Sequence, residues 1–221
     1  MIITIDGPTA SGKSSVARAL ADKLNVYYLN TGLLYRALGY IACTAYNYTL
    51  ATLPTVSDQT IQAILPHLLY RYATDGAQIL YKNSDITENL KNPSMDQAAS
   101  IISAVPIVRM LLLDYQRNFA RHHSLVVDGR DCGSVVFPYA ELKIFLTASV
   151  QVRAERWRND LARKGQYFTE QDSIAFITER DKRDEERAIA PLIVPQGAIV
   201  IDNSTMSLQQ TVEQIVALIQ L

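Results

Sequence analysis

Five short runs of apolar, mostly β-branched side chains recur along the chain, and none of them alternates between apolar and polar positions. A strand with one exposed face would alternate, so these runs are predicted to be parallel strands that are buried on both faces of a sheet. The runs lie at Ile2–Ile5, Val26–Leu29, Leu125–Val127, Leu142–Leu146 and Ala198–Ile201.

Helical patterns separate these runs. The alternation of strands and helices is typical of an open α/β sheet with helices on both sides. With 221 residues, the chain is long enough to bury a sizeable core and has the length of one or two domains. The predicted helices span residues 13–24, 33–46, 107–121, 150–164, 170–187 and 207–219.

One segment departs from this alternation. Leu69–Thr74 and Ala77–Lys82 have strand-like composition and flank Asp75-Gly76, a dipeptide that favours the two-residue turn of a β-hairpin. Because a hairpin is antiparallel, it cannot supply a strand to the parallel core. Residues 67–105 are therefore predicted to form a small inserted subdomain.

Composition and charge exclude several classes of protein. Apolar residues make up 48% and charged residues 19% of the chain, which is typical of a folded globular protein. The net charge of −1 argues against a general nucleic-acid binder, which needs a basic surface. No apolar run approaches the roughly 20 residues of a membrane span, and no signal-like segment precedes Ile2. The cysteines are Cys43 and Cys132, too few for a disulfide framework, so the protein is expected in the reducing cytoplasm.

A phosphate-binding loop follows the first predicted strand. The segment Gly7-Pro8-Thr9-Ala10-Ser11-Gly12-Lys13-Ser14 matches the pattern G-x-x-x-x-G-K-[ST], in which backbone N–H groups surround phosphate oxygens. Lys13 is predicted to contact the β- and γ-phosphates, and the Ser14 hydroxyl to bind Mg²⁺. Ser15 is either an ordinary residue of the first helical turn or a further phosphate contact. Such a loop alone does not separate a kinase from a switch, a motor or a passive nucleotide binder.

Two further segments place polar residues at the carboxyl ends of predicted strands, where open α/β sheets bind ligands. Asp128 and Arg130 follow the third strand. The carboxylate is predicted to lie near Mg²⁺ and the guanidinium to bind an anion, the alternatives being a strand-end cap and a surface arginine. Thr31 and Arg36 follow the second strand and are candidates for a second phosphate site, or Thr31 simply caps the next helix.

The chain resembles bacterial-type cytidylate kinases, which are nucleoside monophosphate kinases, over essentially its full length. The two most specific segments run from Asp128-Gly129-Arg130-Asp131 to Pro138, and from Arg180-Asp181-Lys182-Arg183-Asp184 to Pro191. Adenylate kinases share the phosphate-binding loop but not these strings. Other matching segments are residues 5–15, 29–36, 98–100, 105–109 and 142–149.

The resemblance implies the P-loop NTPase fold, in which helices flank a five-stranded parallel core sheet. It further implies that the hairpin-containing insert binds the nucleoside monophosphate (NMP) and that a mobile lid is present. The expected divisions are the core at 1–66, 106–149 and 166–221, the NMP-binding subdomain at 67–105 and the lid at 150–165.

The resemblance also implies roles for the candidate residues. Gly7–Ser15 would bind ATP, with Mg²⁺ at Ser14 and Asp128, and Thr31, Arg36 and Arg130 would hold the acceptor phosphate. The groups that would neutralise the transferring phosphoryl group are Lys13, Arg36, Arg130 and the lid residues Arg153, Arg156 and Arg158. The groups around cytosine and its phosphate would be Ser100, Arg109, Asp131 and Arg187, and those at the ribose Arg180 and Asp184.

Three positions depart from the usual pattern of the family. Asn30 stands where an Asp is common, Lys91 where an Arg often occurs in the insert, and Trp157 where a second adjacent Arg is frequent in the lid. Arg158, one position on and about 100° around the helix, is the candidate substitute for that missing arginine.

The resemblance predicts the reaction ATP + CMP → ADP + CDP, with dCMP as an expected further acceptor. The enzyme is expected to be a cytoplasmic monomer that binds neither nucleic acid nor membranes. One alternative is the same chemistry with another acceptor, such as UMP, AMP or a small alcohol like shikimate. The other is a P-loop binding protein or switch with negligible transfer.

Overall fold

The structure is a computed structural model that describes residues 1–73 and 76–219. Within these residues the chain forms two compact units. The first unit combines residues 1–27 with the chain from Ser124 onwards, and the second is Tyr28–His123.

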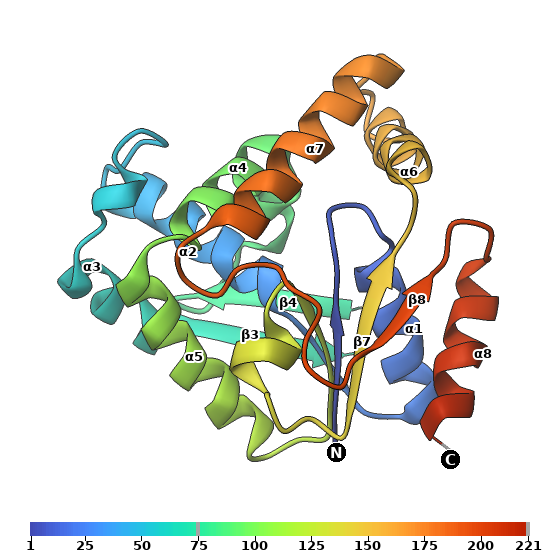
Figure 1. Ribbon diagram of the computed structural model, residues 1–221. Helices are drawn as coiled ribbons and strands as arrows, with labels where there is room; N and C mark the ends of the chain where they lie inside the picture. The colour runs from blue at the N-terminus through green and yellow to red at the C-terminus, as the bar shows by residue number, and fades with distance from the viewer. Residues whose placement is uncertain (74–75, 220–221) are drawn as a thin grey trace. The chain divides into compact units, whose positions relative to one another are not determined.

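The chain contains a parallel sheet, and four of its strands, β1, β6, β7 and β8, belong to the first unit. Among the described residues, this five-stranded sheet has the order β2-β6-β1-β7-β8 (Figure 1). β1 pairs in parallel with β6 on one side and β7 on the other, and β7 pairs in parallel with β8. The strands are β1 (Ile2–Asp6), β2 (Tyr27–Asn30), β6 (Leu125–Gly129), β7 (Leu142–Thr147) and β8 (Ile199–Asp202).

The central strands are buried because their side chains are apolar on both faces. Ile3 and Ile5 of β1 and Val126 of β6 have no exposed surface, as the unalternating runs in the sequence predicted. The outer strand β8 is different, because Ile199 and Val200 are exposed. The predicted five-stranded parallel α/β core is confirmed, and with its phosphate-binding loop it has the P-loop NTPase fold.

Helices follow the strands and flank the sheet (Figure 1). α1 packs against α8, and α6 packs against α7. The side chains of Ser149 and Thr169 cap the N-termini of α6 and α7, satisfying backbone N–H groups that lack an intrahelical partner. The helical elements of this unit are α1 (Lys13–Leu24), the π-helical turn η4 (Cys132–Val136), α6 (Val150–Ala162), α7 (Glu170–Glu186) and α8 (Leu208–Ile219).

The second unit combines helices with a small antiparallel sheet of the order β3-β4-β5. Its helices α2 and α4 lie very close together, since a Cβ added to Gly39 of α2 would stand 2.9 Å from the Cβ of Ala98. The elements are α2 (Thr31–Ala45), η1 (Leu53–Thr55), α3 (Asp58–Ile64), η2 (Leu65–His67), β3 (Leu68–Ala73), β4 (Gly76–Tyr81), β5 (Ser84–Asp85), η3 (Thr87–Leu90), α4 (Pro93–Ile102) and α5 (Pro106–Ala120).

The predicted hairpin is confirmed by the antiparallel register of β3 and β4, which pairs Leu68 with Tyr81 and Ala73 with Gly76. Asp75, the first residue of the predicted turn dipeptide, lies outside the described residues. The segment 67–105 lies wholly within the second unit, which also contains α2 and α5.

The predicted helices are confirmed within about two residues at each end, whereas α3 and α4 were not predicted. Both are short, and their N-termini are set by local caps: the side chains of Ser57 and Asn92 accept hydrogen bonds from backbone N–H groups. In the described part of the chain, no single helix is long and apolar enough to cross a membrane. The helices Ser94–Ile102 and Pro106–Ala120 reach that length and apolar composition only when they are taken together, and the pair is bent by 96°.

Candidate active site

The phosphate-binding loop connects β1 to α1, as predicted. A Cβ on Gly7 would stand 2.0 Å from the carbonyl oxygen of Leu146, so the loop follows a path that only glycine permits there. Gly12 precedes α1 with φ +89°. The Lys13 side chain is buried and its Nζ donates to the carbonyl oxygen of Pro8 at 2.9 Å. Burial, together with the positive charge of Arg130, lowers the pKa of Lys13 well below its usual value.

Ser14 and Asp128 meet beside this loop. The Ser14 hydroxyl donates to Oδ2 of Asp128 at 2.7 Å, joining the first turn of α1 to β6. A hydroxyl and a carboxylate are hard oxygen donors of the kind that Mg²⁺ prefers, and Mg²⁺ takes only one or two protein ligands when phosphates supply others. The pair therefore fits the predicted magnesium site.

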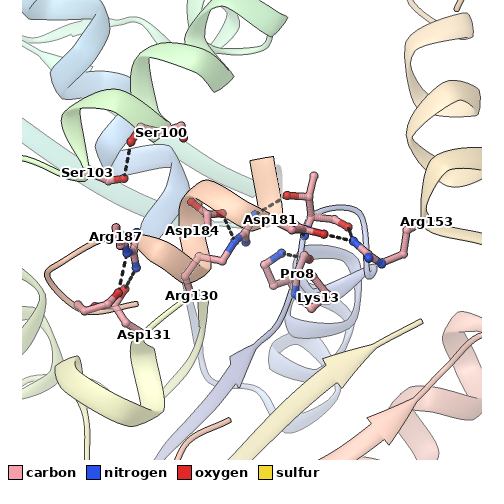
Figure 2. A network of polar contacts seen from close by, with 12 residues as sticks. Pro8, Lys13, Ser100, Ser103, Arg130, Asp131, Arg153, Asp181, Asp184 and Arg187 are labelled. Carbon is pink, nitrogen blue, oxygen red and sulfur yellow. Dashed lines mark hydrogen bonds and ion pairs between the residues drawn. The ribbon is translucent and has the colours of Figure 1, made fainter. Parts of the chain in front are cut away.

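Thr9 contacts three charged side chains of the same unit, Arg130, Arg153 and Asp181, which Figure 2 labels. Its N–H donates to Oδ1 of Asp181 at 2.7 Å. Its carbonyl oxygen accepts from Nη1 of Arg153 at 3.0 Å, and its hydroxyl oxygen accepts from Nη2 of Arg130 at 3.2 Å. Charged side chains from α7, from α6 and from the segment after β6 thus converge on one residue of the loop.

Arg130 and Asp184 form a buried ion pair, with 2.8 Å between Nε and Oδ2. Burial alone would lower the pKa of Arg130, but Asp184, Asp181 and Asp128 outweigh it and raise that pKa. Burial alone would raise the pKa of Asp184, but Arg130 and Arg180 outweigh it and lower that pKa. Both groups therefore keep their charges, as anion binding at Arg130 requires.

A second ion pair lies nearby in the same unit. Nη2 of Arg187 stands 3.2 Å from Oδ1 of Asp131, and both side chains are only 8% exposed. Nε of Arg187 also donates to the carbonyl oxygen of Ala190. Four residues that the resemblance placed at the acceptor nucleotide, Arg130, Asp131, Asp184 and Arg187, are thus held in paired, oriented positions.

Asp6, the last residue of β1, holds the turn that carries Asp131 through hydrogen bonds. Its carboxylate accepts from the N–H groups of Cys132 at 2.8 Å and Gly133 at 2.7 Å. Burial, and to a smaller extent the negative charge of Asp131, raises the pKa of Asp6 to about 6, although the two N–H groups act in the opposite direction.

The three predicted lid arginines lie on α6 but differ in their contacts. Arg153 binds the loop at Thr9, and Arg156 donates to the carbonyl oxygen of Ser11 at 3.3 Å and to Oδ1 of Asn203 at 2.9 Å. Arg158 is half-buried. Trp157 stacks on Phe176 and contacts Phe168, at centroid distances of 4.6 and 5.0 Å. The residue at this position therefore packs α6 against α7 instead of serving as a cation.

In the second unit, Arg36 of α2 forms an ion pair with Asp96 of α4, at 2.6 Å from Nη2 to Oδ1. Nη1 of Arg109 donates to the carbonyl oxygen of Ser103 at 3.0 Å, and its guanidinium lies 5.6 Å from the ring centroid of Tyr35. The carbonyl oxygen of Ser100 accepts from the Ser103 hydroxyl. These predicted acceptor-site residues thus lie on the packed helices α2, α4 and α5.

The alternative role for Thr31 as a helix cap is wrong. Asn30 is the N-cap of α2, because its Oδ1 accepts from the N–H of Leu33 at 2.9 Å. Thr31 is the buried first residue of the helix. The Asn30 amide also donates to the Tyr28 hydroxyl, and an aspartate at this position could not donate that bond. Lys91, which was expected to depart from the family pattern, is paired with Glu88 at the surface.

A sequence model described as cytidylate kinase matches residues 3–221. The chain belongs to the cytidylate kinase family. A family member from Chlamydia pneumoniae, named cytidylate kinase, is 41% identical over 220 residues, which cover 99% of this chain and 98% of that protein. Another, from Stutzerimonas stutzeri (strain A1501), is 38% identical over 220 residues, 98% of this chain and 93% of that protein. The resemblance stated from the sequence is confirmed.

A solved structure of an uncharacterised protein from Eubacterium ventriosum superposes on this member of the family with a TM-score of 0.53. The superposition covers 100% of this chain and 98% of that one at 15% identity. At this level of identity the similarity concerns the fold alone.

Three residues with central positions were not assigned a role from the sequence: Asp6, Asp181 and Asn203. Asp6 is the last residue of β1 and Asn203 follows β8, so both lie at the carboxyl edge of the sheet. The amide of Asn203 donates to the carbonyl oxygen of Ser11 at 3.0 Å. A search for polar residues at the ends of all predicted strands would have found these two. Asp181 lies inside a family string that was recognised, yet its partner Thr9 is 172 residues away in the sequence.

Proposed function

We propose that this protein transfers the γ-phosphoryl group of ATP to CMP, and also to dCMP, forming ADP and CDP or dCDP. The observation that carries this proposal is membership of the cytidylate kinase family over residues 3–221. The phosphate-binding loop and the paired arginines of the site agree with it, because bringing two polyanions together is mainly an electrostatic problem.

The ATP phosphates would bind to Gly7–Ser15. The loop and the N-terminus of α1 offer backbone N–H groups to the phosphate oxygens, and Lys13 adds a cation after exchanging the Pro8 carbonyl for a phosphate oxygen. Ser14 and Asp128 would hold Mg²⁺. When bound, this ion supplies positive charge that offsets the charge on the phosphate groups.

The acceptor nucleotide would bind through arginines and neighbouring polar side chains. Thr31, Arg36 and Arg130 are proposed to hold its phosphate, and Arg180 and Asp184 its ribose. Ser100, Arg109, Asp131 and Arg187 are proposed to surround the cytosine and its phosphate. Asp131 is suited to base selection, because a carboxylate accepts a hydrogen bond from the exocyclic amine of cytosine and repels the carbonyl oxygen of uracil.

The reaction needs no general base. The acceptor phosphate has a second pKa of about 6, so its attacking oxygen is largely ionised at neutral pH. Lys13, Arg36, Arg130 and the α6 arginines Arg153, Arg156 and Arg158 would offset the charge of the two substrates and of the transferring group.

Water must be excluded from this reaction, because it would otherwise hydrolyse ATP. We propose that residues 150–165 act as the lid and residues 67–105 as part of the acceptor-binding subdomain. The segment 150–165 contains α6, whose arginines contact the loop at Thr9 and Ser11. We further propose a cytoplasmic monomer that acts on small nucleotides and not on nucleic acid or membranes, consistent with a net charge of −1.

A coupled assay of ADP release tests the proposal. With ATP and Mg²⁺, the four ribonucleoside monophosphates, dCMP and shikimate are compared as acceptors. Release that depends on CMP and dCMP, with kcat/KM at least tenfold above the other acceptors, supports the proposal. A preference for another acceptor would reassign the substrate. Tight nucleotide binding without any acceptor-dependent release would indicate a binding protein or switch.

A further inference from the structure

We propose that Asp181 is a positioning residue that fixes the lid arginine Arg153 against the phosphate-binding loop at Thr9. The inference rests on the proposed function and deepens it by assigning a role to a carboxylate outside the proposed substrate contacts.

The three residues form a closed ring of polar contacts within one unit, and Figure 2 shows its members Arg153 and Asp181 facing each other. Oδ1 of Asp181 accepts from the Thr9 N–H at 2.7 Å, and Oδ2 forms an ion pair with Nη1 of Arg153. The same Nη1 donates to the Thr9 carbonyl oxygen at 3.0 Å, and Nε of Arg153 donates to the carbonyl oxygen of Ala148. Arg153 is therefore oriented through two of its nitrogens, and Asp181 is its carboxylate partner within the described part of the chain.

The ring is buried, so the loss of one charge from it is costly. The side chains of Arg153 and Asp181 are 11% and 9% exposed, and Thr9 is buried. A buried guanidinium without its carboxylate partner is strongly disfavoured, so Arg153 would leave this position if the charge of Asp181 were removed. The loop would then lose the contact between Arg153 and the Thr9 carbonyl oxygen.

The position of Asp181 on α7 separates it from the acceptor-binding roles of its neighbours. Arg180 precedes it and Asp184 follows one helical turn later, where it pairs with Arg130. Asp181 binds the lid arginine Arg153, whereas Asp184 binds Arg130, which is proposed to hold the acceptor phosphate. Both arginines contact Thr9. We therefore expect Asp181 to act through Arg153 and the loop, and not through CMP.

A double-mutant cycle tests this role. Asp181→Asn keeps an oxygen that can accept from the Thr9 N–H but removes the charge that holds Arg153, and Arg153→Met removes the cation and keeps the length of the side chain. Each single variant should lower kcat by about tenfold or more and leave KM for CMP within about twofold. The double variant should lose no more than the Arg153→Met variant, because Asp181 has no partner left to position.

Independent losses that multiply in the double variant would overturn the proposal, as would a selective rise in KM for CMP in Asp181→Asn. Glu179→Gln is the matched control, since Glu179 lies on the same helix with a 75% exposed side chain, and its kinetics should equal those of the wild type. If Asp181→Asn does not fold, Asp181→Glu replaces it. Its longer side chain should give a smaller loss of kcat that again disappears in the Arg153→Met background.

The affinity for ADP, measured by titration calorimetry, provides a readout that does not depend on the acceptor. Each single variant should bind ADP several-fold more weakly, and the double variant no more weakly than either, because all three disturb the same contact to the loop. If the wild type shows no CMP-dependent release of ADP, the proposed function fails while this second cycle still decides the role of Asp181. Multiplying losses of ADP affinity would contradict that role.

Discussion

Asp6 holds Gly133 through a hydrogen bond of 2.7 Å from the Gly133 N–H to Oδ2 of Asp6. This bond connects the residue that precedes the phosphate-binding loop to the turn that carries Asp131. The Asp6 carboxylate also accepts from the N–H of Cys132. One buried carboxylate therefore fixes two segments that are proposed to bind different substrates.

The titration of Asp6 should appear in the pH dependence of stability. Its pKa in the folded protein, about 6, lies above the ordinary value of 3.8. The folded state therefore binds the proton more tightly, and the contribution of this group to the free energy of unfolding is full below pH 3.8 and is lost as the pH rises through about 6. Relative to Asp6→Asn, which has no such titration, the wild type should lose about 2 kcal/mol between roughly pH 4.5 and 7.5.

Urea unfolding of both proteins at several pH values in this range measures that difference. If the two free energies of unfolding change in parallel with pH, the Asp6 carboxyl is not the group that titrates.

Gly133 should tolerate no side chain. A Cβ at this position would stand 2.7 Å from Oγ1 of Thr4 and 3.1 Å from Cγ of Pro195. Gly133→Ala should therefore lower the free energy of unfolding by about 1–3 kcal/mol, the usual cost of overpacking a buried site. Denaturant unfolding measures the loss, and Thr4→Ala should relieve part of it by removing the nearest atom. Additive losses in the double variant would show that the clash with Thr4 is not the cause.

Asp131→Asn tests the proposed selection of the base. The substitution keeps the size of the side chain and an oxygen that can accept from Arg187, but it introduces an amine that can donate to the carbonyl oxygen of uracil. The ratio of kcat/KM for CMP to that for UMP should fall by about tenfold or more. The measurement is steady-state kinetics with both acceptors, and KM for ATP serves as the internal control. An unchanged ratio would remove Asp131 from the cytosine contacts.

Lys13→Met tests the loop at its central cation. Lys13 is buried and already bonded to the Pro8 carbonyl oxygen, so it is placed to exchange that oxygen for a phosphate oxygen. Loss of the cation should lower kcat for CMP phosphorylation by about 100-fold or more. Lys23→Met, at the exposed end of the same helix, should retain wild-type turnover. Comparable turnover in the two variants would contradict the role of Lys13.

The sequence predicted the parallel core and the phosphate-binding loop because both leave local signals. Buried parallel strands such as Leu125–Val127 are continuous apolar runs, and the loop is defined by the spacing of Gly7, Gly12 and Lys13. The hairpin was likewise evident from a turn dipeptide between strand-like segments.

The polar contacts of the site could not be predicted in the same way. The bond between Thr9 and Asp181 joins residues 172 positions apart, and no local pattern specifies such a pair. Trp157 was noted among the lid arginines, but its stacking on Phe176 depends on how α6 packs against α7. One alternative assigned the N-cap of α2 to Thr31, but the cap is Asn30. The sequence could not decide between them because the two neighbouring residues have similar capping propensity.

The central claim is transfer of a phosphoryl group from ATP to CMP, and the most direct measurement follows the phosphorus atom itself. The protein is incubated with Mg²⁺, unlabelled CMP and ATP that carries a radioactive γ-phosphate, and the products are separated by chromatography. The account predicts that the label appears in CDP at the rate at which ADP forms. Label found only in inorganic phosphate, or in no product at all, would contradict it.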